Sequence, residues 1–272
     1  MAPKMLVASL IAHLLFAVWR SRRREAIYWS SRATGLPADD PRTVATARRS
    51  MVNFARFTMD FVDSVTVSRR DLIRWRMRKL DNKEVLEDAA KDGRGRLLVS
   101  AHLGNWEILG TWISVLKQNL YVVAEPLPGR SFDRLASEVR EHAGLSLIDT
   151  DGAASKIIRA LRSGEWVAIL ADRTVGARGE LVEFFGERAH HPIGAVKLAK
   201  RVGVPVIVGG CWSAGTDGYE GRIFDPLETD DPTVTAEDVM AMAMQQLESL
   251  VSRNPEQWYI AFTSDPVQDE GI

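Results

Sequence analysis

The sequence predicts an α/β domain with a mostly parallel central sheet flanked by helices, preceded by helices that associate with a membrane. From about residue 96 onward, short apolar runs alternate with segments of helical periodicity, which is typical of layered α/β domains. The chain also begins with an apolar helix followed by a cluster of arginines. Finally, positive charge is concentrated near the start, because residues 1–80 hold 16 Lys and Arg against six Asp and Glu.

The composition fits one large globular domain. The chain has 272 residues, of which 46% are hydrophobic and 26% are charged, enough to bury a substantial core. A single cysteine, Cys211, excludes an internal disulfide and a cysteine-rich metal site. It lies in the apolar run VPVIVGGCW, which favours a buried, inert thiol over a nucleophile. The basic start of the chain indicates contact with a polyanion, either nucleic acid or an anionic membrane surface.

The first helix favours the membrane. The apolar run Met5–Trp19 has about fifteen residues, fewer than the roughly twenty that span a bilayer. No charge cluster precedes it and no small-residue cleavage site follows it, so it does not resemble a signal peptide. With Trp19 and the cluster Arg20–Arg24 it is typical of an interfacial helix on anionic headgroups. A core helix and a short spanning helix remain alternatives, and no nucleic-acid module is recognisable.

The second predicted helix covers Pro41–Thr66, where apolar residues recur at three- and four-residue steps. The two helices define an N-terminal membrane-associating segment, residues 1–66, and residues 67–272 form the α/β core. At the start of the core, Ile73, Trp75 and Met77 alternate with arginines, which predicts a half-exposed strand. The stretch KEVLEDAAKDG then reads as a short helix that ends at Gly93.

The rest of the core alternates regularly. Strands are expected at Arg96–Ala101, Leu120–Ala124, Leu145–Ile148, 165–172, 181–185 and 204–210. Helices are expected at Asn105–Lys117, Ser131–Ala143, Ala153–Arg162, 194–203 and 235–254. Thr235 is the expected N-cap of the last helix, and Pro255 ends it.

A histidine and a glutamate frame the turn after the first buried strand, in HLGNWE. His102 lies at the carboxyl end of that strand, where sites collect in parallel sheets. Gly104 permits a tight turn, Asn105 is a good N-cap, and Glu107 falls in the first helical turn. The carboxylate is expected to return to the imidazole, fix its tautomer and leave the other ring nitrogen free to accept a proton. A capped helix with a satisfied core histidine is the alternative.

Several sequence blocks carry a family resemblance. SAHLGNWEILG resembles the His-x4-Asp/Glu block of glycerolipid acyltransferases, and it is most similar to the bacterial branch of lipid A lauroyl/myristoyl acyltransferases and phosphatidylinositol mannoside acyltransferases. LAD with Arg173 and Gly176, VEFFGERAHHPIGAVKLAKRVGVPVIVGG and NPEQWYIAF resemble later blocks of that branch in the same order, and MVNFARFTMDFV resembles its N-terminal helix. The resemblance covers roughly residues 45–262.

The resemblance implies transfer of a fatty acyl chain from coenzyme A or acyl carrier protein to a hydroxyl of a membrane lipid, glycolipid or lysophospholipid. His102 would be the general base and Glu107 its orienting carboxylate, with no acyl-enzyme, no cofactor and no metal. Backbone N–H groups around Gly104–Trp106 are candidate oxyanion donors. The protein would act on the cytoplasmic face of the cell (inner) membrane, held there by the N-terminal helix. A non-catalytic lipid-binding protein on the same fold is the alternative.

A further set of residues is expected to bind substrate: Arg140, Glu125, Arg130, Asn105, Arg173 and Glu183. Arg140 has a fork suited to phosphate, although a solvated helix arginine explains it equally well. Arg173 stands where the resembled branch usually has glutamine, and a pair with Asp172 that braces the sheet is an alternative. The adjacent His190 and His191 lack a further ligand set, so no metal site is expected there.

Overall fold

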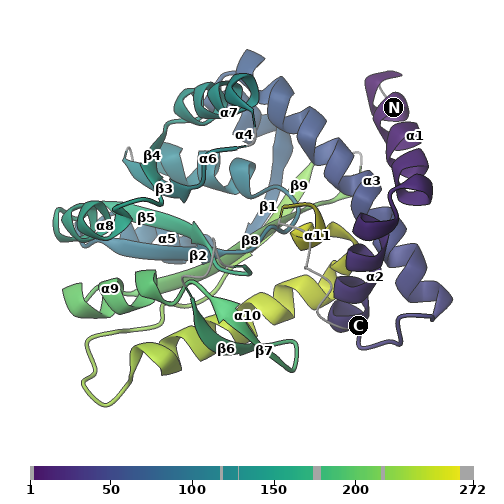
Figure 1. The fold of residues 1–272 in the computed structure, drawn as a ribbon. Helices are drawn as coiled ribbons and strands as arrows, with labels where there is room; N and C mark the ends of the chain where they lie inside the picture. The colour runs from purple at the N-terminus through teal and green to yellow at the C-terminus, as the bar shows by residue number, and fades with distance from the viewer. Residues whose placement is uncertain (1–2, 117–118, 128, 174–178, 216–217, 264–272) are drawn as a thin grey trace.

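A seven-stranded sheet forms the centre of the molecule (Figure 1). The computed structural model describes residues 3–116, 119–127, 129–173, 179–215 and 218–263. The strand order is β1-β9-β8-β2-β5-β3-β4. Only β8 and β9 are antiparallel neighbours, and the other neighbouring strands run parallel. The strands are β1 (Met77–Asp81), β2 (Arg96–Ser100), β3 (Leu120–Ala124), β4 (Leu145–Asp149), β5 (Trp166–Leu170), β8 (Val206–Ser213) and β9 (Tyr219–Ile223). The predicted α/β class with a mostly parallel central sheet is confirmed.

Helices cover both faces of the sheet. Successive side chains of a strand point to opposite sides, so an apolar strand presents apolar side chains to both layers of helices. Leu97 and Val99 of β2 pack with α8 (Ala153–Arg162), α9 (Gly194–Val202) and α10 (Ala236–Arg253). Leu98 faces the other layer, with α5 (Glu84–Ala89) and α6 (Trp106–Leu116). Helix α7 (Arg130–His142) lies beyond that layer, against α3 (Pro41–Asp63) and Tyr259. The expected cap of α10 is present, with Thr235 and Asp238 bonding each other's backbone N–H groups.

The N-terminal helices pack together at one edge of the molecule (Figure 1). Helices α1 (Pro3–Val18) and α2 (Arg20–Thr34) both lie against α3, around a small core that includes Phe16, Ala26 and Met51. Within the described residues no helix alone has the length and hydropathy to cross a membrane; α1 and α2, bent by 96°, pass that test only as a pair. Helix α2 is an addition, since two helices were expected here and the structure has three.

The expected strand around residues 73–78 is wrong for most of its length. Arg69–Arg76 form helix α4, and β1 begins only at Met77. The Ser68 hydroxyl caps this helix by accepting the Asp71 N–H, and arginine is a good helix former. The alternating pattern was therefore a coincidence of composition over one and a half helical turns.

Two further strands were not expected. β9 pairs with β8, and β7 (Glu187–His191) pairs with β6 (Glu180–Phe184) in a separate two-stranded antiparallel sheet. The short elements η1 (Ser64–Thr66), η3 (Pro255–Gln257) and α11 (Ile260–Thr263) complete the described chain.

Candidate active site

The HLGNWE turn is held in place by its own backbone. Gly104 has φ 58°, and a Cβ there would lie 2.1 Å from the carbonyl oxygen of Cys211, so the close approach requires glycine. The Gly104 N–H donates to the carbonyl of Gln257 (2.8 Å), and the Asn105 N–H donates to that of Cys211 (3.2 Å). Two of the expected oxyanion donors are thus already engaged; the N–H of Trp106 makes no hydrogen bond to the described residues. As expected, Asn105 caps α6, accepting the Ile108 N–H at 3.0 Å.

The carboxylate that orients His102 is Asp172. His102 Nδ1 lies 2.8 Å from Asp172 Oδ1, and the backbone N–H of His102 donates to Oδ2 at 2.9 Å. The indole N–H of Trp258 donates to the same Oδ2 at 2.8 Å. Asp172 is only 1% exposed. A buried carboxylate at Nδ1 favours the proton on that nitrogen, which leaves Nε2 able to accept one.

The contact comes from strand register. β2 and β5 are parallel neighbours in which Ser100 lies opposite Leu170, so the residues two places further on, His102 and Asp172, meet just beyond the sheet. Burial by itself would raise the pKa of the Asp172 carboxyl. The charge and hydrogen bonds of His102, with the Trp258 N–H, outweigh burial and hold that pKa below its ordinary value. Asp172 is therefore ionised at neutral pH.

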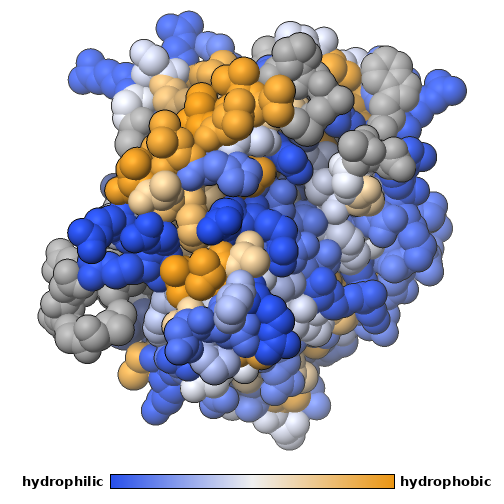
Figure 2. Space-filling model, turned by 90° about the vertical axis from the view of Figure 1, so that its right-hand side faces the viewer, coloured by the Kyte–Doolittle hydropathy of each residue, from blue (hydrophilic) through white to orange (hydrophobic). Residues whose placement is uncertain are grey.

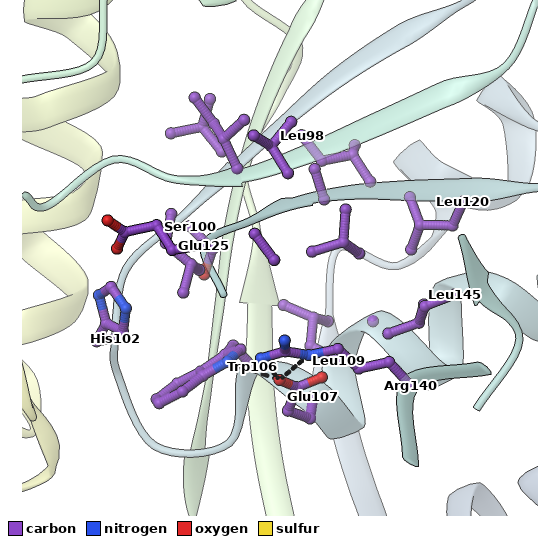
Figure 3. Close-up of a pocket in the computed structure, with 18 of the residues that line it drawn as sticks. Leu98, Ser100, His102, Trp106, Glu107, Leu109, Leu120, Glu125, Arg140 and Leu145 are labelled. Atoms are coloured by element: carbon purple, nitrogen blue, oxygen red, sulfur yellow. Dashed lines mark hydrogen bonds and ion pairs between the residues drawn. The ribbon is translucent and has the colours of Figure 1, made fainter. Parts of the chain in front are cut away.

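Glu107 does not orient His102, contrary to expectation. Its Oε1 accepts two hydrogen bonds from Arg140, at 3.0 Å from Nε and 2.8 Å from Nη2, and one at 3.2 Å from the Trp106 indole. Both partners of this ion pair are mostly buried, and the charge of Glu107 raises the pKa of Arg140. The first turn of α6 directs Glu107 toward α7, away from the end of β5, and Figure 3 shows the pair below the imidazole. The structure thus brings together two residues predicted separately.

His102, Glu107 and Arg140 line one cavity of about 810 Å³. Figure 3 shows apolar side chains extending from them along the sheet. The apolar lining comes from the strands and from α6, and it includes Leu98, Leu109, Ile113, Leu120, Leu145, Ile207 and Ile223. Phe54, Phe57 and Phe61 of α3 line it from the N-terminal helices. Trp106 stands edge-on to His102, with ring centroids 5.1 Å apart. A volume of this size is typical of pockets for small organic ligands.

The remaining predicted residues divide into two groups. Glu125 and Arg173 line the cavity and form an ion pair at 2.6 Å. Asp172, the partner of Arg173 in the alternative interpretation, is bonded to His102 and Trp258. Arg130, at the start of α7, and Glu183, on β6, are exposed and are not among the residues that line the cavity.

No cluster of three or more His, Cys, Asp and Glu side chains with metal-binding geometry occurs among the described residues. His190 and His191 each bond a backbone carbonyl instead, that of Gly179 and that of Ala171. Cys211 is buried, and burial raises the pKa of its thiol.

Sequence reasoning missed Asp172 as the partner of His102, and it missed Trp258. One signal was present in the sequence, because Asp172 and His102 each follow an apolar strand. Adjacency of the two strands was the missing information, because alternating strands and helices do not specify the strand order.

Comparison with known proteins finds similarity to acyltransferases that act on lipids. The family described as bacterial lipid A biosynthesis acyltransferase matches residues 36–261. A phosphatidylinositol mannoside acyltransferase of Mycobacterium tuberculosis strain H37Rv is 25% identical over 215 residues, 78% of this chain and 67% of the relative. That of Mycolicibacterium smegmatis is 28% identical over 179 residues, 64% and 58% of the two chains. The crystal structure of 1-acyl-sn-glycerophosphate (LPA) acyltransferase, PlsC, from Thermotoga maritima aligns with a TM-score of 0.44 and 14% identity, over 93% of this chain and 97% of that one.

Proposed function

The chain belongs to the bacterial lipid A biosynthesis acyltransferase family and is an acyltransferase, and from this premise we propose that it moves a fatty acyl chain from coenzyme A or acyl carrier protein to a hydroxyl of a lipid or glycolipid. The family and the enzyme class are those expected from the sequence. One observation carries the finer proposal: His102, held by a buried ionised carboxylate, opens onto a cavity whose walls are mostly apolar.

In the proposed reaction, Nε2 of His102 takes the proton of the acceptor hydroxyl as its oxygen attacks the thioester carbonyl carbon. The tetrahedral intermediate collapses with cleavage of the carbon–sulfur bond, and the imidazolium returns the proton to the departing sulfur. Asp172 stabilises the imidazolium while it exists and keeps the ring in one tautomer. No acyl-enzyme forms. General base catalysis of this kind contributes on the order of 10²–10⁴ in rate.

The cavity supports a long acyl chain as the transferred group. Its apolar lining would remove the chain from water, at about 0.8 kcal/mol for each buried methylene. Arg140 lies at the same cavity, held by Glu107. We assign Arg140 to an anionic group of the donor or acceptor and Glu107 to the positioning of Arg140. The curated relatives are named as acyltransferases of phosphatidylinositol mannoside, so a hydroxyl of a glycolipid is the acceptor class we favour.

The outer face of α1 supports membrane association. Leu10 and Leu14 are 62% and 63% exposed, and further apolar residues of α1 are exposed with them, namely Leu6, Val7, Ile11, Leu15 and Val18. Figure 2 shows a continuous apolar band on this side of the molecule, with hydrophilic side chains around it. The arginines that begin α2 follow directly. We propose that residues 1–66 associate with the cytoplasmic leaflet and residues 67–272 form the catalytic core, with α3 contributing to the cavity wall.

The test is acyl transfer by the purified protein. Palmitoyl-CoA and palmitoyl-acyl carrier protein are offered with phosphatidylinositol mannosides and with lysophosphatidic acid, and thiol release and acylated product are both measured. We expect transfer by the wild type, a loss of about 10²–10⁴ in kcat for His102→Ala, and a loss in the same range for Asp172→Asn. His190→Ala, at an exposed histidine on β7, is the matched control and keeps wild-type turnover.

The alternative is a non-catalytic lipid-binding protein on this fold. It predicts binding of the same lipids without consumption of any thioester. Wild-type turnover by purified, folded His102→Ala would contradict the catalytic role of the histidine.

A further inference from the structure

The hydroxyl of Ser100 lies in the cavity wall and has no hydrogen-bond partner in the part of the chain that the structure describes. Ser100 is the last residue of β2, two places before His102, and it lines the cavity. Its Oγ is buried and bonds to none of the described residues. Buried hydroxyl groups in folded proteins are almost always hydrogen-bonded, so an unpaired one requires an explanation.

The direction of the side chain supplies part of that explanation. Strand side chains alternate, so Ser100 shares a face with Leu98, which belongs to the layer that contains α6. Figure 3 shows Ser100 between His102 and the apolar side chains of the cavity. An acyl chain lying among those side chains, with its carbonyl carbon near His102, would bring its carbonyl oxygen to the level of Ser100.

The transfer needs a hydrogen-bond donor beside the carbonyl oxygen of the thioester. Negative charge develops on the carbonyl oxygen when the acceptor attacks, and preorganised donors lower the barrier. Of the three turn N–H groups expected from the sequence to serve, those of Gly104 and Asn105 are bonded to Gln257 and Cys211 instead, which leaves that of Trp106 and calls for a second donor. A serine hydroxyl is a donor that rotates freely toward its acceptor.

On the basis of the proposed function, we propose that Ser100 is a catalytic residue that donates a hydrogen bond to the thioester carbonyl oxygen and stabilises the oxyanion of the tetrahedral intermediate. The hydroxyl keeps its proton and forms no bond to carbon throughout the reaction. Ser100 thus contacts the thioester group itself, whether coenzyme A or acyl carrier protein bears the acyl chain.

The variants Ser100→Ala and Ser100→Thr test this with palmitoyl-CoA as the probe. We expect Ser100→Ala to lower kcat by about 100-fold with little change in KM for the donor, and Ser100→Thr, which keeps a hydroxyl, to recover most of the loss. Because Ser100→Ala removes an unpaired polar group, its melting temperature should equal or exceed that of the wild type. A purely structural serine would show the opposite pattern. Ser146→Ala, on β4 and outside the cavity lining, is the matched control.

A second readout does not depend on turnover. Infrared spectra of bound [1-13C]palmitoyl-CoA report hydrogen bonding to the thioester carbonyl. A band at lower wavenumber in the wild type than in Ser100→Ala supports the assignment. Identical bands, unchanged kcat in Ser100→Ala or a covalent acyl adduct on Ser100 overturn it, even if the wild type transfers acyl groups. Failure of the wild type to bind or consume any thioester overturns the proposed function and this assignment together.

Discussion

Asp172 links the candidate site to the stability of the fold. Its carboxyl has a pKa below the ordinary value in the folded protein, because the favourable contacts with His102 outweigh burial. In the unfolded chain an aspartate titrates near about 3.9. The ionised carboxyl therefore stabilises the folded protein above that pH, and this contribution is lost as the pH falls below about 4 toward the folded pKa.

Urea unfolding between pH 3 and 6 measures that contribution. We expect the free energy of unfolding of the wild type to fall more steeply below pH 4 than that of Asp172→Asn, because the variant has no carboxyl group to protonate at position 172. Asp149→Asn, at the exposed end of β4, the edge strand of the same sheet, should keep the wild-type slope. Equal slopes for wild type and Asp172→Asn would show that the carboxyl is not held ionised.

Substitutions at the Glu107–Arg140 pair should affect the stability of the fold and the transfer activity separately. Removing one partner of a buried ion pair leaves the other charge uncompensated, so Glu107→Ala should cost about 3–5 kcal/mol in the free energy of unfolding. The double variant Glu107→Met/Arg140→Met should recover most of this, since apolar residues of similar volume replace such pairs well. We expect it to remain impaired in transfer, because it lacks the guanidinium that we propose binds an anionic group of the substrate.

Chemical unfolding and kinetics of the single and double variants separate the two effects. Arg134→Met/Glu138→Met, at an exposed pair on the same helix α7, controls for loss of an ion pair alone. Full activity in the stable double variant would remove both residues from the substrate contacts.

At the scale of the element, the exposed face of α1 makes a testable prediction. Leu10→Asp/Leu14→Asp introduces charge into an apolar surface that the fold already leaves exposed, so the melting temperature should hardly change. Binding to vesicles of phosphatidylcholine and phosphatidylglycerol should fall by at least tenfold, because the apolar contribution is lost. Cosedimentation at low and high salt measures it. Leu181→Asp, at a half-exposed leucine on β6, should bind as the wild type does; equal loss in both would argue against a specific face.

The helices and strands also show where local patterns suffice. The turn at Gly104 and the caps at Asn105 and Thr235 were predicted, because each depends on a few adjacent residues. The strand expected at 73–78 failed, since a six-residue alternation also fits a short helix with a serine cap. β9 was missed, because its pairing with β1 and β8 depends on chain partners that a local pattern does not contain.

At the scale of the whole molecule, we expect the size of the cavity to limit the length of the acyl chain that the protein transfers. Gly110 of α6 lines the cavity, and a Cβ there would lie 3.5 Å from Leu145, an ordinary contact. Gly110→Leu should therefore fold and fill part of the cavity. We expect the ratio of kcat/KM for palmitoyl over lauroyl donors to fall about tenfold or more. Val115→Leu, at an exposed position of the same helix, should leave the ratio unchanged, and an unchanged ratio in Gly110→Leu would show that the chain lies elsewhere.

The sequence by itself determined the α/β class, the turn that carries His102, the caps that begin its helices and the family to which the chain belongs. These depend on residue periodicity, on turn chemistry and on ordered motifs, all of which are local along the chain. Only the tertiary structure decided which carboxylate faces His102. Glu107 is five residues away and yet bonds Arg140, whereas Asp172 is 70 residues away and bonds the imidazole. The reason is that β2 and β5 are neighbouring parallel strands whose register brings their carboxyl ends together. The first turn of α6, in contrast, points Glu107 toward α7.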